Sequence, residues 1–258
     1  MKKLSVSIIT LNEEKNIERC LKSVSWADEI IVVDSGSKDK TFEICEKYGC
    51  KIIKTDWLGF GRTKKLAVDS ASHEWILSID SDEELSEELK NKIKELLENS
   101  QYNGYYIKRN SFYLGKLIKY CWGNDFQLRF FNRKFGNFND NIIHESVEFQ
   151  GNLGKIKAPI IHYTYPTIES SIAKTGQYSD LSAEQMFNKG KKITLLGAVL
   201  RGFIKFFKMY IINMGFLDGK EGFVLSVISS FGVIVKYLKL WELESRSSKH
   251  LIPGKIEK

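Results

Sequence analysis

The first hundred residues alternate short apolar runs with amphipathic helical segments, and this alternation restricts the possible folds more than any other feature. Apolar runs typical of strands occupy residues 4–10, 30–33, 51–54 and 75–79. Helical patterns follow at residues 13–24, 40–48, 61–70 and 86–98. Repeated strand–helix units of this length predict a mostly parallel central sheet with right-handed crossovers. We therefore expect an α/β fold.

The rest of the chain has a different pattern. Strands are expected at residues 105–113, 126–131 and 156–163, with glycines between them. From residue 167 to the end the pattern is helical. We predict a first domain over residues 1–165, with halves at 1–100 and 101–165, and a helical region over residues 166–258.

Two carboxylates, Asp80 and Asp82, end the apolar run that starts at Trp75. The carboxyl ends of parallel strands are where open α/β sheets bind ligands. Hard oxygen ligands suit Mg²⁺ or Mn²⁺, which usually reach a protein through one or two carboxylates and substrate phosphates. Alternatively, these acids and the glutamates from Glu83 onward cap the next helix.

Polar residues also follow the first two strands. Thr10, Asn12 and Glu13 follow the first, with Asn12 expected as a helix N-cap, and Asp34 follows the second. In a parallel sheet these positions and Asp80 lie at one edge. Asp34 resembles the acids that bind a ribose in nucleotide-binding folds. Alternatively, it is a turn residue that stabilises the loop after its strand. The chain has neither a Gly-x-Gly-x-x-Gly motif nor a Gly-Lys-Ser/Thr phosphate loop, which disfavours dinucleotide and ATP chemistry.

Further candidates lie in loops. Glycines before Lys64 allow close approach of an anionic ligand, and Lys64 is a candidate nucleotide contact. Asp125 and Glu145 are candidate general bases, and His144 is a candidate metal ligand or a structural histidine.

The net charge of +7 and the pI near 9.0 predict an anionic partner. Residues 185–217 contain no acid, and Arg201, Lys205 and Lys208 form a basic stripe beside an apolar one. This pattern indicates an interfacial helix on an anionic membrane surface, or alternatively a hairpin that packs on the core or on a second subunit. The uncharged run 222–235 is too short for the about 20 apolar residues of a spanning helix. Nucleic acid is disfavoured, because the basic residues accompany aliphatic side chains.

Together these motifs resemble family 2 glycosyltransferases, and more closely the lipopolysaccharide core enzymes of the β-1,4-glucosyltransferase type. The resemblance is carried by residues 7–14, 26–37, 59–61, 80–82, 126–131, 138–140, 144–147, 162–163 and 215–219. One departure is Lys65, where such proteins commonly have asparagine.

The resemblance implies a GT-A fold and an inverting, metal-dependent transfer of a hexose from a nucleotide sugar such as UDP-glucose. It implies a donor site in residues 1–100 and an acceptor site in residues 101–165. The residues expected to bind the donor are Thr10, Asn12, Glu13, Asp34, Lys64, Asp80 and Ser81. The residues expected to hold Mn²⁺ or Mg²⁺ are Asp80, Asp82 and His144. The base is expected to be Asp125, with Glu145 as the alternative.

The acceptor implied by the resemblance is a lipopolysaccharide core, or a related glycolipid or oligosaccharide. A chain start that becomes polar by Asn12 is not typical of a signal peptide, so we expect a cytoplasmic protein, peripheral at the inner face of the cell membrane. Two alternatives remain open: a polyprenyl-phosphate glycosyltransferase, and a catalytically silent membrane-associated protein that binds sugar nucleotides. A homo-oligomer is also possible.

Overall fold

The structure, a computed structural model, describes residues 2–123, 125–141 and 145–250. It contains two compact units. The sheet unit comprises Met1–Phe112 and Asn124–Thr164, and the helical unit comprises Tyr113–Gly123 and Tyr165–Lys258. The segment Tyr113–Gly123 thus joins the helices, although its place in the sequence had put it in the first domain. The reason is packing, because Tyr113 and Cys121 share a core with helical residues.

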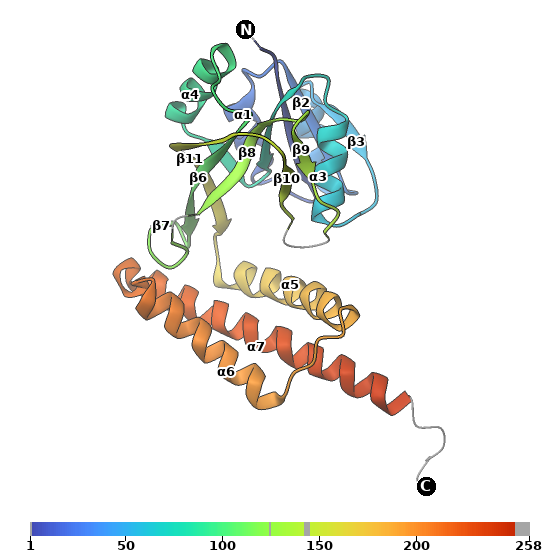
Figure 1. Cartoon of the computed structure of the whole chain (residues 1–258), viewed down its shortest axis with the longest axis vertical. Coiled ribbons are helices and arrows are strands. Elements are labelled where there is room, and N and C mark those ends of the chain that lie inside the picture. The colour runs from blue at the N-terminus through green and yellow to red at the C-terminus, as the bar shows by residue number, and fades with distance from the viewer. Residues whose placement is uncertain (1, 124, 142–144, 251–258) are drawn as a thin grey trace. The chain divides into compact units, whose positions relative to one another are not determined.

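Among the described residues, a nine-stranded sheet runs in the order β3-β2-β1-β4-β8-β6-β11-β5, with β7 beside β6 (Figure 1). The first four strands in this order are parallel, as the strand–helix alternation predicted. The strand β8 is antiparallel to both β4 and β6, and β5 is antiparallel to β11. The bounds are β1 Leu4–Thr10, β2 Glu29–Asp34, β3 Lys51–Lys54, β4 Trp75–Asp80, β5 Glu83–Leu85, β6 Gly104–Tyr113, β7 Lys116–Ile118, β8 Phe126–Asn132 and β11 Leu153–Tyr165. A separate hairpin pairs β9 (Gly136–Phe138) with β10 (Val147–Phe149).

Helices cover both faces of the parallel strands. On one face, α1 (Ile17–Val24), α2 (Thr41–Lys47) and α4 (Glu87–Glu98) pack on inward residues such as Val6 and Leu77. On the other face lie α3 (Phe60–Asp69) and the β9–β10 hairpin, which contact Ile31 and Ile76. Burial on both faces explains why these strands read as continuous apolar runs rather than alternating ones.

Two local expectations were wrong. The first helix begins at Ile17 rather than at residue 13, because the backbone amide of Glu13 is bound by the Thr41 hydroxyl. Of the acids after Asp82, Glu87 and Glu88 lie in the first turn of α4 as expected, whereas Glu83 and Glu84 do not belong to that helix. Glu83 begins β5 and is fully buried, and the cap of α4 is Ser86, whose hydroxyl accepts from the Leu89 amide.

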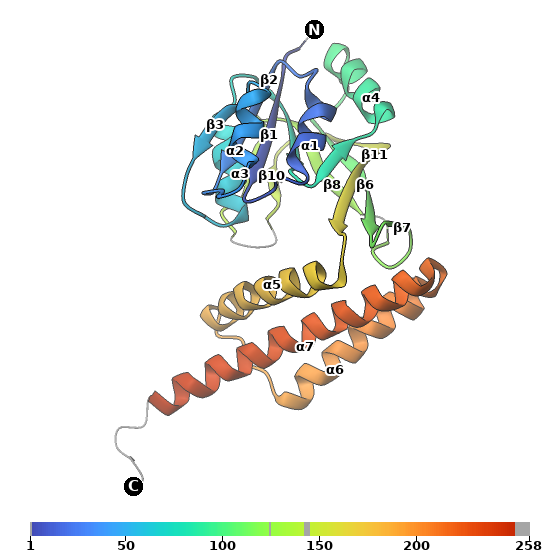
Figure 2. The same ribbon diagram turned by 180° about the vertical axis from the view of Figure 1, so that it is seen from behind.

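Among its described residues, the helical unit contains three long helices, with α6 and α5 each lying beside α7 (Figures 1 and 2). They are α5 (Ile168–Asn188), α6 (Leu195–Phe207) and α7 (Gly219–His250). A π-helical turn, η1 (Lys208–Ile212), continues α6, and a 3-10 turn, η2 (Gly215–Asp218), leads into α7. In the described chain, Gly215–Ser247 is long and apolar enough to cross a membrane, although the uncharged run alone suggested otherwise. Core helices of soluble proteins share that property.

Asp218 fixes the loop of the helical unit. Its side chain is 2% exposed and accepts hydrogen bonds from the backbone amides of Lys119, Tyr120 and Cys121, at 2.9, 3.0 and 2.8 Å. Three donors on one buried carboxylate form a strong, charge-assisted anchor. This contact gives the motif at residues 215–219 a structural role within the helical unit.

Candidate active site

The strand register places three of the expected site residues at one edge of the sheet. Thr10 is opposite Asp34 in the β1–β2 pair, and Ile9 is opposite Asp80 in the β1–β4 pair. These positions are the carboxyl ends of three adjacent parallel strands, the edge at which α/β sheets bind ligands.

The loops after β1 and β2 hold each other through side chains. Asn12 has a left-handed backbone (φ 54°), and its side-chain oxygen accepts from the Lys38 amide at 2.8 Å, so it is not a helix N-cap. Asp34 is 3% exposed and accepts from the amide and hydroxyl of Ser37 at 3.0 and 2.6 Å. The hydroxyl oxygen of Ser37 in turn accepts from the Asn12 amide, in the loop after β1, at 2.9 Å. The turn chemistry of Asp34 thus builds the edge of the site.

Asp80 is held by two cations. Its Oδ2 lies 2.6 Å from Arg129 Nη2, and its Oδ1 lies 2.8 Å from Lys64 Nζ. Arg129 comes from β8 and is 5% exposed, and Lys64 comes from α3 and is 4% exposed. Burial alone would raise the pKa of the Asp80 carboxyl, but Arg129 and Lys64 hold this pKa well below its usual range. Asp80 is therefore a fixed carboxylate.

Asp82 has a different neighbour. Its Oδ2 lies 3.5 Å from Nε2 of His162 on β11, and its carbonyl accepts from the Tyr163 amide at 3.0 Å. Nδ1 of His162 lies 3.1 Å from the Ser111 hydroxyl, which fixes the ring orientation. Ser81, between the two aspartates, is 7% exposed. A carboxylate and an oriented imidazole nitrogen thus face one another.

A second arginine connects Asp125 to this cluster. Arg109 on β6 donates to Oδ2 of Asp125 through Nε at 2.7 Å and Nη2 at 2.6 Å. Its Nη1 lies 3.5 Å from Oε1 of the buried Glu83, and Arg129 Nη2 lies 3.6 Å from the same oxygen. Burial alone would lower the pKa of Arg109, but Glu83 and Asp125 raise it, so the guanidinium stays charged. Gln127 donates to the other oxygen of Asp125 at 2.8 Å.

Glu145 meets the cluster through Lys64. Its Oε1 lies 2.7 Å from Lys64 Nζ, so that one ammonium group joins Glu145 to Asp80. Lys64 and Glu145 line a hollow of about 120 Å³ between α3, β8 and the hairpin, together with Arg129 and Gln127. Aromatic rings, including Phe126, complete the lining. A small hollow with charged groups and aromatic faces suits part of a sugar.

Gly61 lets the hairpin connection approach α3. Its amide donates to the Asn141 carbonyl at 2.9 Å. A Cβ added at Gly61 would lie 2.2 Å from the Asn139 carbonyl oxygen and 2.6 Å from that of Asn141. Gly61 was expected to let the backbone approach a ligand, whereas it lets two backbone segments pack against one another.

The residues present fit a divalent cation. Carboxylates outnumber basic side chains in the connected cluster, with Asp80, Glu83, Asp125 and Glu145 against Lys64, Arg109 and Arg129. Asp82, two positions after Asp80 and beside His162, adds a further carboxylate. No three of the described histidine, cysteine, aspartate and glutamate side chains form a metal cluster by themselves. Asp82 and His162 offer two ligands, and Mn²⁺ and Mg²⁺ normally take the remainder from phosphate and water. His144, the third expected ligand, lies outside the described residues.

Sequence reasoning missed Arg109, Arg129 and His162 as site residues. Two of them lie within stretches that carry the family resemblance, yet no spacing rule assigns them a role. Each comes from an antiparallel strand far along the chain from Asp80. In β8, Gln127 and Arg129 alternate with apolar residues, which signals one polar side, but His162 follows the register of the buried Ile156, Ala158 and Ile160 in β11 and had no such signal.

The sheet order defines a mixed α/β fold of the GT-A type, with carboxylates at the carboxyl end of β4. The sequence model of glycosyl transferase family 2 matches residues 5–151 of this chain. The chain therefore belongs to glycosyl transferase family 2 and is an enzyme of that class.

Several relatives match nearly the whole chain, among them proteins of two genera. A protein of Rickettsia bellii named as a glycosyltransferase is 36% identical over 94% of this chain and 87% of its own length. The lipopolysaccharide core biosynthesis glycosyltransferase LpsC of Rhizobium meliloti is 27% identical over 93% of this chain and 92% of its own length.

Two solved structures are also similar. Staphylococcus aureus TarS in complex with UDP-GlcNAc is 16% identical, with a TM-score of 0.49 over 95% of this chain and 92% of that one. Glucosyl-3-phosphoglycerate synthase from Mycobacterium tuberculosis, in complex with Mn²⁺ and UDP, is 26% identical, with a TM-score of 0.35 over 43% of this chain and 44% of that one.

Proposed function

We propose that this protein is an inverting, metal-dependent hexosyltransferase. It moves a sugar from a UDP-sugar to a lipopolysaccharide core or a related glycolipid at the inner face of the cell membrane. The observation that carries the proposal is the placement of Asp80 and Asp82 at the carboxyl edge of β4, beside the ends of β1 and β2. The likeness to LpsC along nearly the whole chain supports the acceptor class.

Asp82 and His162 would hold the metal ion in this proposal. When bound, it would supply positive charge that neutralises the diphosphate of the donor as the leaving group. Asp80 is not a first choice as a ligand, because Arg129 and Lys64 already occupy both of its oxygens. The two cations neutralise its charge but leave each oxygen a second lone pair, so we assign Asp80, with Ser81, to hydrogen bonding with the donor.

The nucleoside lies over the ends of β1 and β2. The backbone there is set by Asn12, Asp34 and Ser37, which bind one another across the two loops. Thr10 and Glu13 flank this platform. Lys64, which stands between Asp80 and Glu145, provides the positive charge that faces the donor sugar and phosphate.

Asp125 is the proposed general base. Arg109 and Gln127 each donate to one oxygen of Asp125, and these hydrogen bonds fix the orientation of the carboxylate. It accepts the proton of the acceptor hydroxyl as that oxygen attacks the anomeric carbon and the bond to the diphosphate breaks. Such a single displacement inverts the anomeric centre through oxocarbenium-like charge. Glu145 is the second candidate, because it lines the hollow beside Lys64.

The experiment is a donor screen with the purified full chain. UDP with Mn²⁺ should raise the melting temperature, since a ligand of the folded state stabilises it by RT ln(1 + [L]/Kd). NAD and ATP should not. Release of UDP from UDP-glucose or UDP-GlcNAc, with delipidated lipopolysaccharide core as acceptor, then tests transfer.

Variants connect the result to the site. Asp82→Asn and His162→Gln should each remove the gain that Mn²⁺ gives to UDP binding. Asp140→Asn changes an exposed acid in the same unit and should leave it intact. If the affinity of the unmodified protein for UDP does not depend on Mn²⁺, the metal assignment is refuted. Transfer to a polyprenyl phosphate but not to the core would favour that acceptor instead.

A further inference from the structure

The outward side of α6 is apolar. Leu196, Phe203 and Ile204 are 69%, 66% and 64% exposed, and Leu200 and Phe207 are also more than half exposed. We call these five residues the apolar face. A helix on the surface of a soluble protein normally turns its polar side outward, so this arrangement is reversed.

The opposite side of α6 is fixed to α7. Ser230 on α7 donates to the carbonyl of Gly202 at 2.8 Å, and a Cβ added at Gly202 would lie 2.3 Å from Cγ1 of Ile234. The helix therefore cannot rotate to bury its apolar face without losing this close contact.

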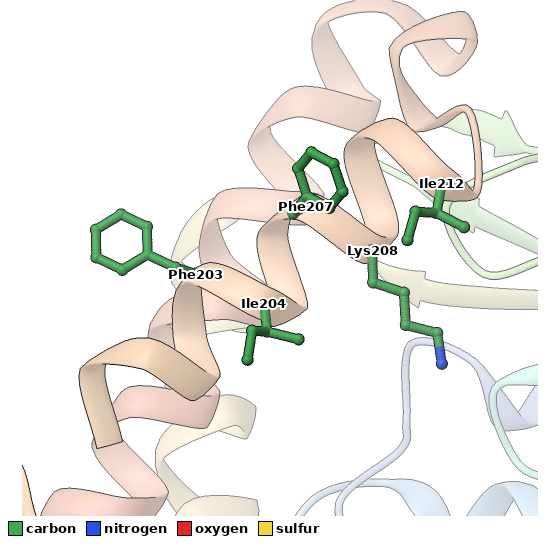
Figure 3. A pocket seen from close by; sticks show the side chains of 5 residues that line it. All are labelled: Phe203, Ile204, Phe207, Lys208 and Ile212. Carbon is green, nitrogen blue, oxygen red and sulfur yellow. The ribbon is translucent and has the colours of Figure 1, made fainter. Parts of the chain in front are cut away.

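A hollow of about 380 Å³ opens on the same side (Figure 3). Phe203, Ile204, Phe207 and Ile212 line it, and Lys208 is the one charged residue in the lining. The hollow thus combines hydrocarbon walls with an ammonium group at one side.

Four cations lie beside the apolar face: Arg201, Lys205, Lys208 and Lys236. We call them the cation cluster. Arg201 Cζ and Lys236 Nζ lie 5.1 and 4.8 Å from the ring centroid of Tyr237. Burial, and then the charge of Lys208, lower the pKa of Lys205. Burial, followed by Lys205 and Arg201, lowers that of Lys236, so these groups are close enough to repel one another.

The cation cluster lacks counter-charges. Within the described part of the chain, no carboxylate forms an ion pair with any of its four members. The neighbouring Lys239, on the same helix, does have one and lies 2.6 Å from Asp180. Residues 185–217 contain no acid at all. Uncompensated, partly buried cations constitute a site for an anion.

We propose that this face binds anionic lipid in a bilayer, with headgroup phosphates on the cation cluster and acyl chains against the apolar face and its hollow. The inference deepens the proposed function, on which it rests, because it assigns membrane attachment to α6 and η1 lying in the interface. Basic residues along the edge of an outward apolar stripe are typical of interfacial helices. Each basic group near an anionic bilayer strengthens binding.

Charge complementarity favours lipid over a second copy of this chain. A two-fold dimer through this face would bring the same patch from both subunits together, including both cation clusters. Like charges facing one another oppose such an interface. An anionic bilayer offers acyl chains to the apolar face and negatively charged headgroups to the cation cluster at the same time.

Vesicle co-sedimentation of the full chain tests the proposal. Binding should be strong to phosphatidylcholine vesicles that contain phosphatidylglycerol and weak to phosphatidylcholine alone. Lys205→Gln with Lys236→Gln should weaken the anionic binding by at least about tenfold. The matched control, Lys92→Gln with Lys134→Gln, removes the same charge from exposed lysines of the sheet unit and should change binding by less than about twofold.

A second pair of variants tests the apolar face. Phe203→Ser with Phe207→Ser should also release the protein from anionic vesicles. Ile168→Ser with Ile172→Ser removes similarly exposed apolar side chains from α5 and should not. Equal losses in the cation-cluster and control lysine pairs would overturn the proposal, as would equal binding to neutral vesicles. A dimer in solution that Phe203→Ser with Phe207→Ser dissociates, without any vesicle binding, would identify a subunit interface and overturn it too.

A UDP thermal shift with Mn²⁺ on each variant separates this inference from the proposed function. A retained shift in a protein that no longer binds vesicles locates the defect in the membrane face. A shift that is missing even in the unmodified chain refutes the donor assignment, whatever the vesicles show.

Discussion

Arg129 Nη2 lies 2.6 Å from Asp80 Oδ2, and this pair joins an antiparallel strand to the carboxyl end of a parallel one. Because Lys64 binds the other oxygen of Asp80, the first aspartate of the motif is already neutralised by protein. The second aspartate instead lies beside His162, 3.5 Å from its Nε2, which is why the proposed function assigns the metal ion to this pair. The two aspartates, two positions apart, thus have different chemistry.

Replacing Arg129 should destabilise the fold strongly. Arg129→Met leaves Asp80 and the fully buried Glu83 without their shared guanidinium, and breaking a buried pair costs about 3–5 kcal/mol. Lys134→Met removes one partner of the exposed pair with Glu74 and should cost less than about 1 kcal/mol. Urea unfolding of both variants measures the difference. Similar free energies of unfolding would show that Arg129 contributes little to stability.

The general base can be identified by two isosteric variants. Asp125→Asn should lower kcat by about 10²–10⁴-fold and leave the Kd for UDP with Mn²⁺ nearly unchanged, because a base contributes only in the transition state. Glu145→Gln should instead weaken donor binding, since it releases Lys64 from one partner. Initial rates and UDP titrations separate the two effects. The opposite pattern would transfer the role of base to Glu145.

A methyl group at Gly61 should disrupt the site. Gly61→Ala places a Cβ 2.2 Å from the Asn139 carbonyl oxygen, so the connection that precedes Glu145 must move. We expect weaker UDP binding and a lower melting temperature. Gly176→Ala in α5 meets nothing within 4 Å and should stabilise by up to about 1 kcal/mol, because alanine favours helix. Normal UDP binding by Gly61→Ala would show that this contact is not needed.

Glu29 should make stability depend on pH in acid. Burial alone would raise the pKa of its carboxyl, but hydrogen bonds from Ser5 and Ser72 lower it below the usual value. A depressed pKa gives stability that is present above about pH 4.3, the ordinary glutamate value, and is lost as the pH falls through the folded value. The stability gap between the unmodified chain and Glu29→Gln should therefore shrink on acidification. Ser72→Ala should make this acid dependence shallower, and an unchanged gap in acid would contradict the assignment.

Asp218 should be essential to the helical unit. Asp218→Ala leaves three backbone amides without their acceptor, with a penalty of about 1–3 kcal/mol for each buried donor left unpaired. Asp218→Asn keeps one acceptor oxygen and should be intermediate. Hydrogen exchange at Lys119, Tyr120 and Cys121 reports the change locally. Amides that remain protected in Asp218→Ala would refute the anchor.

Much of the fold of residues 1–100 was predictable from the sequence. Strands buried on both faces give continuous apolar runs, and their lengths and order predict a parallel sheet. The register of the parallel strands alone brings Thr10, Asp34 and Asp80 to one edge of that sheet, independently of the later strands. The two aspartates and part of the family resemblance lie in or next to the same short segments.

The partners of these residues were not predictable in this way. Glu83 looked like a helix cap and is a buried strand residue that faces two arginines. Asn12 looked like an N-cap and bridges two loops. Neither role has a local signal, because each partner lies 25 or more positions away in the sequence.

The sequence by itself determined the class of fold, the edge at which the site forms and the presence of a basic apolar segment near the C-terminus, since strand burial and charge patterns are local properties. The tertiary structure alone decided which aspartate is neutralised and which side of α6 faces outward. Both depend on long-range packing, in which β8 brings Arg129 to Asp80 and Gly202 fixes α6 on α7.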